Sequence, residues 1–164
     1  MIDPDQTAPS RLYPEIESYV LQRTREFDQI STERKAELQQ LANYTGACIA
    51  KGQDAKLTFV CTHNSRRSHL TQIWTQIAAV HYEVTHVQTF SGGTEVTACN
   101  LRTVAGLKRC GLRFSIKSES SSNPHYAVAF SDMELPLICF SKVFNRPPNP
   151  LSNYCAVLVC GLPD

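Results

Sequence analysis

The chain has 164 residues, of which 42% are hydrophobic, and its formal net charge is +1. The length and hydrophobic content suffice for one full core, and the near-balance of charge, without a basic stripe interleaved with aromatic residues, disfavours a nucleic-acid or membrane-surface protein. No apolar run reaches the length of a membrane-spanning helix, and the N-terminus lacks the basic start and apolar stretch of a secretory signal, so we expect a cytoplasmic protein.

The N-terminal third of the chain predicts a lead and two helices. Residues 1–10 are polar and proline-containing, which is typical of a disordered lead. Residues 11–55 predict a helical extension, in which 14–30 follows an imperfect helical pattern and Ser31 or Thr32 could cap a second helix. The apolar stripes of these helices must either pack on the rest of the chain or form a dimer, and packing within the chain is the simpler expectation.

From residue 56 the pattern changes to strands that alternate with helices. This alternation implies an α/β fold of flavodoxin-like type, with a parallel sheet and helices on both of its faces. A weaker pattern predicts a hairpin that either joins the sheet or forms a flap near the functional site. The expected strands are 57–60, 87–90 and 154–159, of which the first and last are expected to be buried. The expected helices are 68–81 and 100–110, and the hairpin strands are 126–130 and 137–144.

The seven cysteines lack the paired Cys-x2-Cys spacing of a zinc site, and several fall within apolar patterns. We therefore expect most of them to be reduced core residues, as a reducing intracellular compartment allows. The histidines at 69, 81, 86 and 125 have no spacing that suggests a metal site either. We expect neither a metal nor another cofactor.

One segment carries the chemistry: Cys61 follows the strand 57–60, Arg67 comes six positions later, and Ser68 comes next. A strand that turns directly into a helix points backbone N–H groups inward, and such a concave helix N-terminus binds anions. The same field, with a guanidinium nearby, should lower the thiol pKa below its free value of about 8.5, which makes Cys61 a candidate nucleophile. Arg67 can hold two phosphoryl oxygens, and Ser68 can donate a hydrogen bond to the thiolate.

The five residues between Cys61 and Arg67 are predicted to bind the substrate: Thr62, His63, Asn64, Ser65 and Arg66. Asn64 tolerates the left-handed conformation that a tight loop requires. Arg66 adds positive charge at the mouth, which favours small, highly charged oxyanions such as phosphate or arsenate and would also attract a phosphorylated protein. The alternative is a buried cysteine beside two solvated arginines, but a helix N-terminus repels cations, so a bound anion explains the arginines better.

The stretch 57–68 resembles the phosphate-binding loop of the low-molecular-weight protein tyrosine phosphatases and of the thioredoxin-coupled arsenate reductases that share their fold. Cys61, Asn64, Arg67 and Ser68 match in register after a strand, and 91–95 is similar to the Ser-Ala-Gly-Thr segment that follows the second strand in this family. The resemblance covers residues 56–164. It implies a phosphatase-like catalytic domain that hydrolyses phosphomonoesters through a cysteinyl-phosphate intermediate.

The chain also departs from the family pattern. His63 stands where many relatives have glycine, and Arg66 stands where phosphatases often have a second cysteine. Members of the family continue into a loop with an Asp-Pro pair, whose Asp is the general acid, and into a last helix, neither of which is found before Asp164. The resemblance therefore implies either poor turnover of aryl phosphates or a longer parent chain.

Cys160 leaves a second function open. At the end of the corresponding strand, arsenate reductases of this fold carry a cysteine that attacks the first cysteine after arsenate has bound. The resemblance thus implies a possible thiol relay from Cys61 to Cys160, with thioredoxin or a low-molecular-weight thiol as reductant. Cys160 is otherwise one more small apolar residue at a strand end. A third interpretation is a catalytically weakened oxyanion-binding module.

Overall fold

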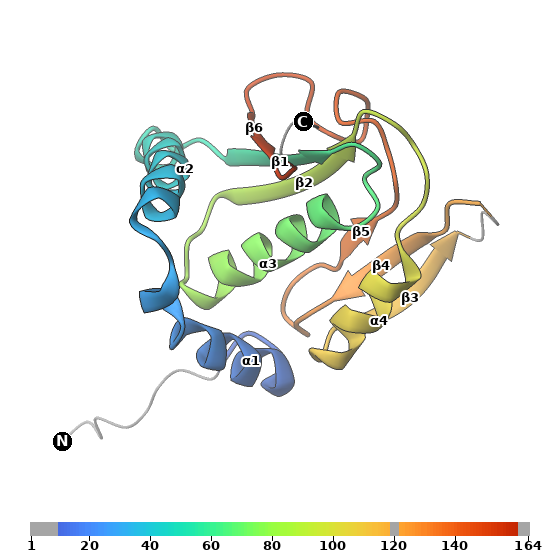
Figure 1. Ribbon diagram of the computed structural model, residues 1–164, viewed down its shortest axis with the longest axis horizontal. Helices are drawn as coiled ribbons and strands as arrows, with labels where there is room; N and C mark the ends of the chain where they lie inside the picture. Colours follow the sequence, from blue (N-terminus) through green and yellow to red (C-terminus); the bar gives the residue numbers. More distant parts are fainter. Residues whose placement is uncertain (1–9, 119–121, 161–164) are drawn as a thin grey trace.

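The computed structural model describes residues 10–118 and 122–160 (Figure 1). The predicted disordered lead lies outside this range except for Ser10. The helices are α1 (Pro14–Thr24), the short 3-10 helix η1 (Phe27–Gln29), α2 (Thr32–Ala50), α3 (Arg67–His81) and α4 (Leu101–Arg109). The strands are β1 (Ala55–Cys61), β2 (Val87–Gly93), β3 (Arg113–Ser118), β4 (His125–Ala129), β5 (Leu137–Cys139) and β6 (Cys155–Leu158).

The first sheet is parallel, with the strand order β2-β1-β6, and it confirms the predicted α/β class. The register pairs Cys61 with Gly93 and Val60 with Leu158, so the carboxyl ends of all three strands meet at one edge. Helix α3 packs on β1 and β2, where Ile73 is almost fully buried. This edge is where ligands bind in open parallel sheets.

The two faces of this sheet are covered differently. The Ser91 side chain faces α3, because its Oγ lies 3.2 Å from Nδ1 of His69. At the next residue, Gly92, a Cβ would point to the opposite face and would lie 2.2 Å from the Cα of Phe144. Asn149 holds the covering segment in place through a 3.0 Å hydrogen bond from its Nδ2 to the Ser91 carbonyl. At this position a loop covers the second face, whereas the predicted arrangement has helices on both faces of the sheet.

The predicted hairpin forms, but it belongs to a second sheet. Strands β4 and β5 pair antiparallel, and β3 pairs with β4 on the other side to give the order β3-β4-β5. Beyond β5 the chain returns to the parallel sheet, where Val143 forms an isolated parallel bridge with Gly93 at the end of β2. Strand β3 was not predicted, because five of its six residues are exposed and follow no apolar alternation. The predicted strand 137–144 is too long, since the chain leaves the sheet after Cys139.

The N-terminal helices differ in how they pack. Helix α1 begins at Pro14, buries Ile16 completely, and stacks Tyr19 on Trp74 of α3 with ring centroids 4.9 Å apart. The predicted single helix over 14–30 is wrong, because α1 ends at Thr24 and η1 follows. Helix α2 has the predicted cap: the Ser31 Oγ accepts a 3.2 Å hydrogen bond from the Arg34 N–H. No residue of α2 is buried.

Strand β6 is one of the two edge strands of the parallel sheet in the described part of the chain. The prediction that this strand is buried is wrong, because Ala156 and Leu158 are exposed, Leu158 to 72%. Apolar composition indicated a strand correctly, but exposure depends on which strands lie beside it. The described residues contain no helix that is both long and apolar enough to cross a membrane.

Candidate active site

The loop between β1 and α3 lies at the carboxyl edge of the parallel sheet (Figure 1). Cys61 is the last residue of β1, and Arg67 and Ser68 open α3. The residue that precedes the helix, Arg66, caps none of its N–H groups with its side chain, and the first turn has no acidic residue. The amide groups at this end of α3 are therefore available to an anion.

Cys61 is 5% exposed, and its sulfur lies 3.1 Å from the Ser68 Oγ. Asn64 donates a 2.8 Å hydrogen bond from its Nδ2 to this same oxygen, and its own Oδ1 accepts from the Lys142 N–H at 2.9 Å. These bonds fix the orientation of the Asn64 amide and leave the Ser68 hydroxyl hydrogen for the sulfur.

The pKa of Cys61 is lowered from its ordinary value. Burial raises this pKa, but hydrogen bonds from the Ser68 hydroxyl and from the backbone N–H groups of Ser68, Ser65 and Asn64 lower it further than burial raises it. Hydrogen bonds to a charged form favour that form. The loop therefore favours the thiolate, in the direction that the sequence predicts, and backbone amides are among the causes.

Neighbouring segments bind the carbonyl oxygens of the loop from outside. Because these oxygens are held by the surroundings, the backbone turns its N–H groups toward the sulfur and the space beside it, which makes an anion nest. The bonds run from Thr94 N to Cys61 O (3.2 Å), Glu95 N to Thr62 O (2.9 Å), Thr97 Oγ1 to His63 O (3.0 Å), Ser141 Oγ to His63 O (2.9 Å) and Asn100 N to Ser65 O (2.9 Å).

Two residues allow the tight path of this loop. Asn64 has the left-handed φ of 43° that the sequence analysis expected. Gly93 supports the loop from the next strand: a Cβ there would lie 2.5 Å from the Thr62 oxygen and 2.7 Å from the Asn64 nitrogen. Side chains larger than hydrogen cannot fit at Gly93 without a shift of this backbone. The sequence analysis assigned Gly93 no role of its own, although a Gly-Gly pair at a strand end is a signal of close backbone approach.

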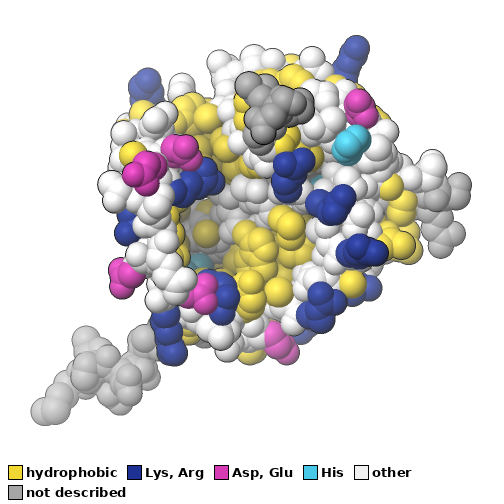
Figure 2. All heavy atoms as spheres, in the orientation of Figure 1, with side chains coloured by type: hydrophobic (Ala, Val, Ile, Leu, Met, Phe, Trp, Pro, Cys, Tyr) yellow, Lys and Arg dark blue, Asp and Glu magenta, His cyan; other side chains and the backbone are white. Residues whose placement is uncertain are grey.

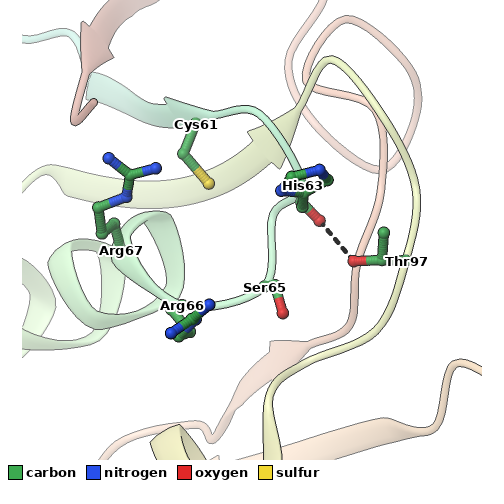
Figure 3. Close-up of a pocket in the computed structure, with 6 residues that line it drawn as sticks. All are labelled: Cys61, His63, Ser65, Arg66, Arg67 and Thr97. Atoms are coloured by element: carbon green, nitrogen blue, oxygen red, sulfur yellow. Dashed lines mark hydrogen bonds between the residues drawn. The ribbon is translucent and has the colours of Figure 1, made fainter. Parts of the chain in front are cut away.

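A pocket of about 520 Å³ opens above the loop. Figure 3 shows the Cys61 sulfur between the Arg67 side chain and His63. Arg66 and Arg67 are both exposed. The His63 Nε2 lies 3.5 Å from Oε2 of Glu95. The residues that line the pocket are Cys61, His63, Ser65, Arg66, Arg67 and Thr97.

The predicted substrate-binding residues thus divide into two groups. His63, Ser65 and Arg66 line the pocket. Thr62 and Asn64 do not, and instead support the loop through the contacts described above. Ser68 likewise lies behind the sulfur, fully buried. Thr97 is a lining residue that the sequence analysis did not single out.

Lys142 is a second residue that the sequence analysis missed. Its side chain is 7% exposed, and burial lowers its pKa to about 8. Its Nζ donates to the Phe140 carbonyl at 3.3 Å. The backbone of Lys142 contacts both supports of the loop, since its N–H bonds Asn64 and its carbonyl accepts from the Gly93 N–H at 2.9 Å. No local pattern marks a lysine within the apolar run 137–144 for this position.

Cys160 follows β6 and is half-buried. The Val159 N–H donates to the Val60 carbonyl at 3.0 Å, so Cys160 comes just beyond the same sheet edge as Cys61. Cys160 does not line the pocket. Among the described residues, no group of three or more His, Cys, Asp or Glu side chains is placed to hold a metal ion.

Comparisons of this chain with protein-family models, with curated proteins and with solved structures find no match.

Proposed function

We propose that this protein is a cysteine-dependent phosphatase with a flavodoxin-like fold of low-molecular-weight protein tyrosine phosphatase type. The observation that carries the proposal is the environment of the Cys61 sulfur, which accepts hydrogen bonds from three backbone N–H groups and a hydroxyl beneath a pocket lined by two arginines. A site that stabilises a sulfur anion with so many donors also suits a tetrahedral oxyanion. The strand order β2-β1-β6 and the Cys61 position at the sheet edge support the fold assignment.

The reaction that we infer has two steps. A phosphomonoester binds with its equatorial oxygens on the loop amides and Arg67, and the Cys61 thiolate attacks phosphorus in line as the bond to the leaving oxygen breaks. Water then attacks the cysteinyl phosphate, the S–P bond breaks, and inorganic phosphate leaves with the thiolate restored. The arginine and the amides supply the charge compensation at phosphorus.

Protonation of the leaving oxygen is the step for which the described lining residues provide the fewest candidate groups. No carboxylate among the described residues lines the pocket, and the Nε2 of the lining residue His63 lies 3.5 Å from Oε2 of Glu95. Substrates whose leaving group needs little protonation should therefore be turned over best.

The test is the release of para-nitrophenol from para-nitrophenyl phosphate, with a rapid-quench search for the cysteinyl phosphate. We expect wild type to show both, Cys61→Ser to show neither, and Cys48→Ser, which changes a half-buried cysteine on α2, to behave as wild type. Equal hydrolysis by wild type and Cys61→Ser would contradict the proposal.

Arsenate reduction is the second candidate, and the hydrogen bond between Val159 and Val60, which brings Cys160 to the edge of Cys61, favours it. Arsenate would condense with the Cys61 thiol and release water. Cys160 would then attack the Cys61 sulfur to form a disulfide, arsenite would leave with two electrons, and thioredoxin or a low-molecular-weight thiol would reduce the disulfide. Arsenate-dependent thioredoxin oxidation that is lost in Cys160→Ser would favour this reaction. Binding of phosphate without turnover of either substrate would favour an oxyanion-binding module.

A further inference from the structure

Helix α4 starts directly beside the candidate active site. The N–H of its capping residue, Asn100, donates to the Ser65 carbonyl at 2.9 Å, and the Ser65 hydroxyl donates to the Ala98 carbonyl at 2.7 Å. The helix buries Thr103, Val104 and Leu107 against the core and contains no acidic residue. Its outer side therefore continues the surface of the pocket rim.

Two arginines lie on this outer side. Arg102 and Arg109 are both exposed, and seven residues of helix make nearly two turns, so they share one stripe of α4. A Cβ built on Gly106 would lie 3.7 Å from an Nη2 atom of Arg109, so the Arg109 side chain extends back along the helix toward its first turn. Figure 2 shows Lys and Arg side chains that follow one another over the start of α3 and over α4. We call Arg66, Arg67, Arg102 and Arg109 the basic row.

The charges of the basic row are not neutralised within the described residues, 10–118 and 122–160. None of its four guanidinium groups has a carboxylate within 4 Å there. At the pocket end of the row, the Glu95 carboxylate lies 3.5 Å from His63. A set of unpaired cations on one side of a chain with a net charge of only +1 is a strong local attraction for an anionic partner.

We propose that the basic row binds an acidic segment of a phosphorylated protein, next to the phosphate held by the loop. This inference rests on the proposed phosphatase function and names its substrate class. Helix α4 has nine residues and is about 13 Å long. An extended peptide covers that distance with about four residues, so the acidic side chains belong within about five positions of the phosphorylated one. Leu101, the first residue of α4, is 71% exposed and offers an apolar contact to the same segment.

A protein segment fits this surface better than a nucleic acid. Helix α4 has no aromatic side chain on which a base could stack, and its sequence is LRTVAGLKR. The basic row is also short: it contains four guanidinium groups and extends from the pocket to the end of α4. Acidic side chains that flank a phosphate meet this short row, whereas a nucleic acid would meet it with a few phosphates and no platform for its bases.

The test compares two phosphopeptides that differ only in flanking residues, Asp and Glu in one and Asn and Gln in the other. We expect wild type to show about tenfold higher kcat/KM for the acidic peptide, since two exposed charge pairs each contribute a few-fold. The double variant Arg102→Gln/Arg109→Gln should lose this preference and keep wild-type turnover of para-nitrophenyl phosphate. Arginine and glutamine have similar helix propensities, so α4 should persist.

The control is Lys35→Gln/Lys51→Gln, which removes the same charge from exposed positions at α2 and should keep the preference. High salt should reduce the preference in wild type. Equal turnover of both peptides by an active wild type would contradict the proposed role of the basic row and would leave the proposed phosphatase function unaffected.

A second readout does not depend on turnover. Fluorescence anisotropy of the labelled acidic peptide, without its phosphate, should show binding to the full chain that the double variant weakens about tenfold. Absence of binding, or binding that both double variants retain, would overturn the inference even if the protein proves not to be a phosphatase. Tighter binding of a single-stranded oligonucleotide of equal charge at the same salt concentration would also overturn it, in favour of a nucleic-acid partner.

Discussion

Cys61, Cys99 and Cys139 have similarly small exposed fractions of 5%, 5% and 0%, although Cys61 lines the pocket and the pair Cys99 and Cys139 does not. Burial raises the pKa of Cys99 to about 11 and that of Cys139 to about 12, whereas the pKa of Cys61 is lowered. Burial acts in the same direction at all three thiols. The difference is that hydrogen-bond donors surround the Cys61 sulfur, so the local dipoles and not the exposure decide which cysteine ionises.

The region of Cys99 and Cys139 holds a full positive charge, Lys142, and still does not produce a thiolate. The lysine lowers the pKa of both cysteines by less than burial raises it. The same burial lowers the pKa of Lys142 itself to about 8. Several oriented donors in contact with a sulfur thus stabilise its anion more than one nearby cation does, because the donors are held in place by the fold.

The largest expected effect is on stability, through Lys142. Its pKa is 10.5 in its ordinary state and about 8 when folded, so between these values the unfolded chain binds more protons. Lys142 should therefore destabilise the fold by about 3 kcal/mol below pH 8, and this cost should vanish as the pH rises toward 10.5. The raised pKa values of Cys99 and Cys139 act in the opposite direction over the upper part of this range, so the effect of Lys142 is the difference between wild type and Lys142→Met. In urea unfolding, Lys142→Met should be more stable than wild type at pH 7, by an amount that shrinks toward pH 10.

Lys35→Met serves as the control, because Lys35 is exposed on α2 and its loss changes the net charge equally. Its free-energy difference from wild type should be the same at pH 7 and pH 10. A free-energy difference between wild type and Lys142→Met that is the same at pH 7 and pH 10 would show that Lys142 is not held as a buried cation. The comparison between a buried cation beside Cys99 and Cys139 and oriented donors beside Cys61 would then fail.

A smaller effect is expected in alkylation by iodoacetamide, which compares the thiols directly. At pH 7 a thiol with a pKa of about 11 is ionised to roughly one part in 10⁴, whereas a pKa below the ordinary 9.0 gives more than about one part in 10². Cys61 should therefore react at least about 100-fold faster than Cys99, and faster still than Cys139. Peptide mass spectrometry gives the rate at each site. Millimolar phosphate should slow Cys61 alone, and equal rates at all three would contradict the comparison.

The sequence was sufficient to predict those parts of the fold that depend on neighbouring residues. The strand before Cys61, helix α3 and the Ser31 cap of α2 were predicted because periodicity and capping are local signals. Strand β3 was missed because its side chains are exposed, and β6 was wrongly expected to be buried. Both depend on which strands lie alongside, which a local pattern does not contain.

The candidate site divides in the same way. The order of Cys61, Asn64, Arg67 and Ser68 is contiguous and was predicted, including the left-handed Asn64. The groups that hold the loop open come from far along the chain, and no spacing rule connects them with Cys61. Gly93, Thr97, Ser141 and Lys142 are examples, each brought to the loop by the pairing of strands and by the loop after β5.

The smallest effect that we predict concerns one of the donors at Cys61. Ser68→Ala removes the hydroxyl that lies 3.1 Å from the sulfur and leaves the backbone N–H groups of Ser65 and Asn64 in place. A hydrogen bond to a charged group contributes about 1.5 kcal/mol or more, so the pKa of Cys61 should rise by about one unit. Because the thiolate fraction falls with that rise, alkylation of Cys61 at pH 6 should slow about tenfold, and the midpoint of its pH profile should move upward.

Ser65→Ala is the matched control, because the Ser65 hydroxyl donates to the Ala98 carbonyl while its backbone N–H bonds the sulfur. This variant should leave the pH profile of Cys61 alkylation in place. If both variants shift the midpoint equally, the position of the loop, and not the Ser68 hydroxyl, sets the pKa. If neither variant shifts the midpoint, the backbone N–H groups alone distinguish Cys61 from Cys99 and Cys139. The low pKa of Cys61 then results from its place in the loop between β1 and α3.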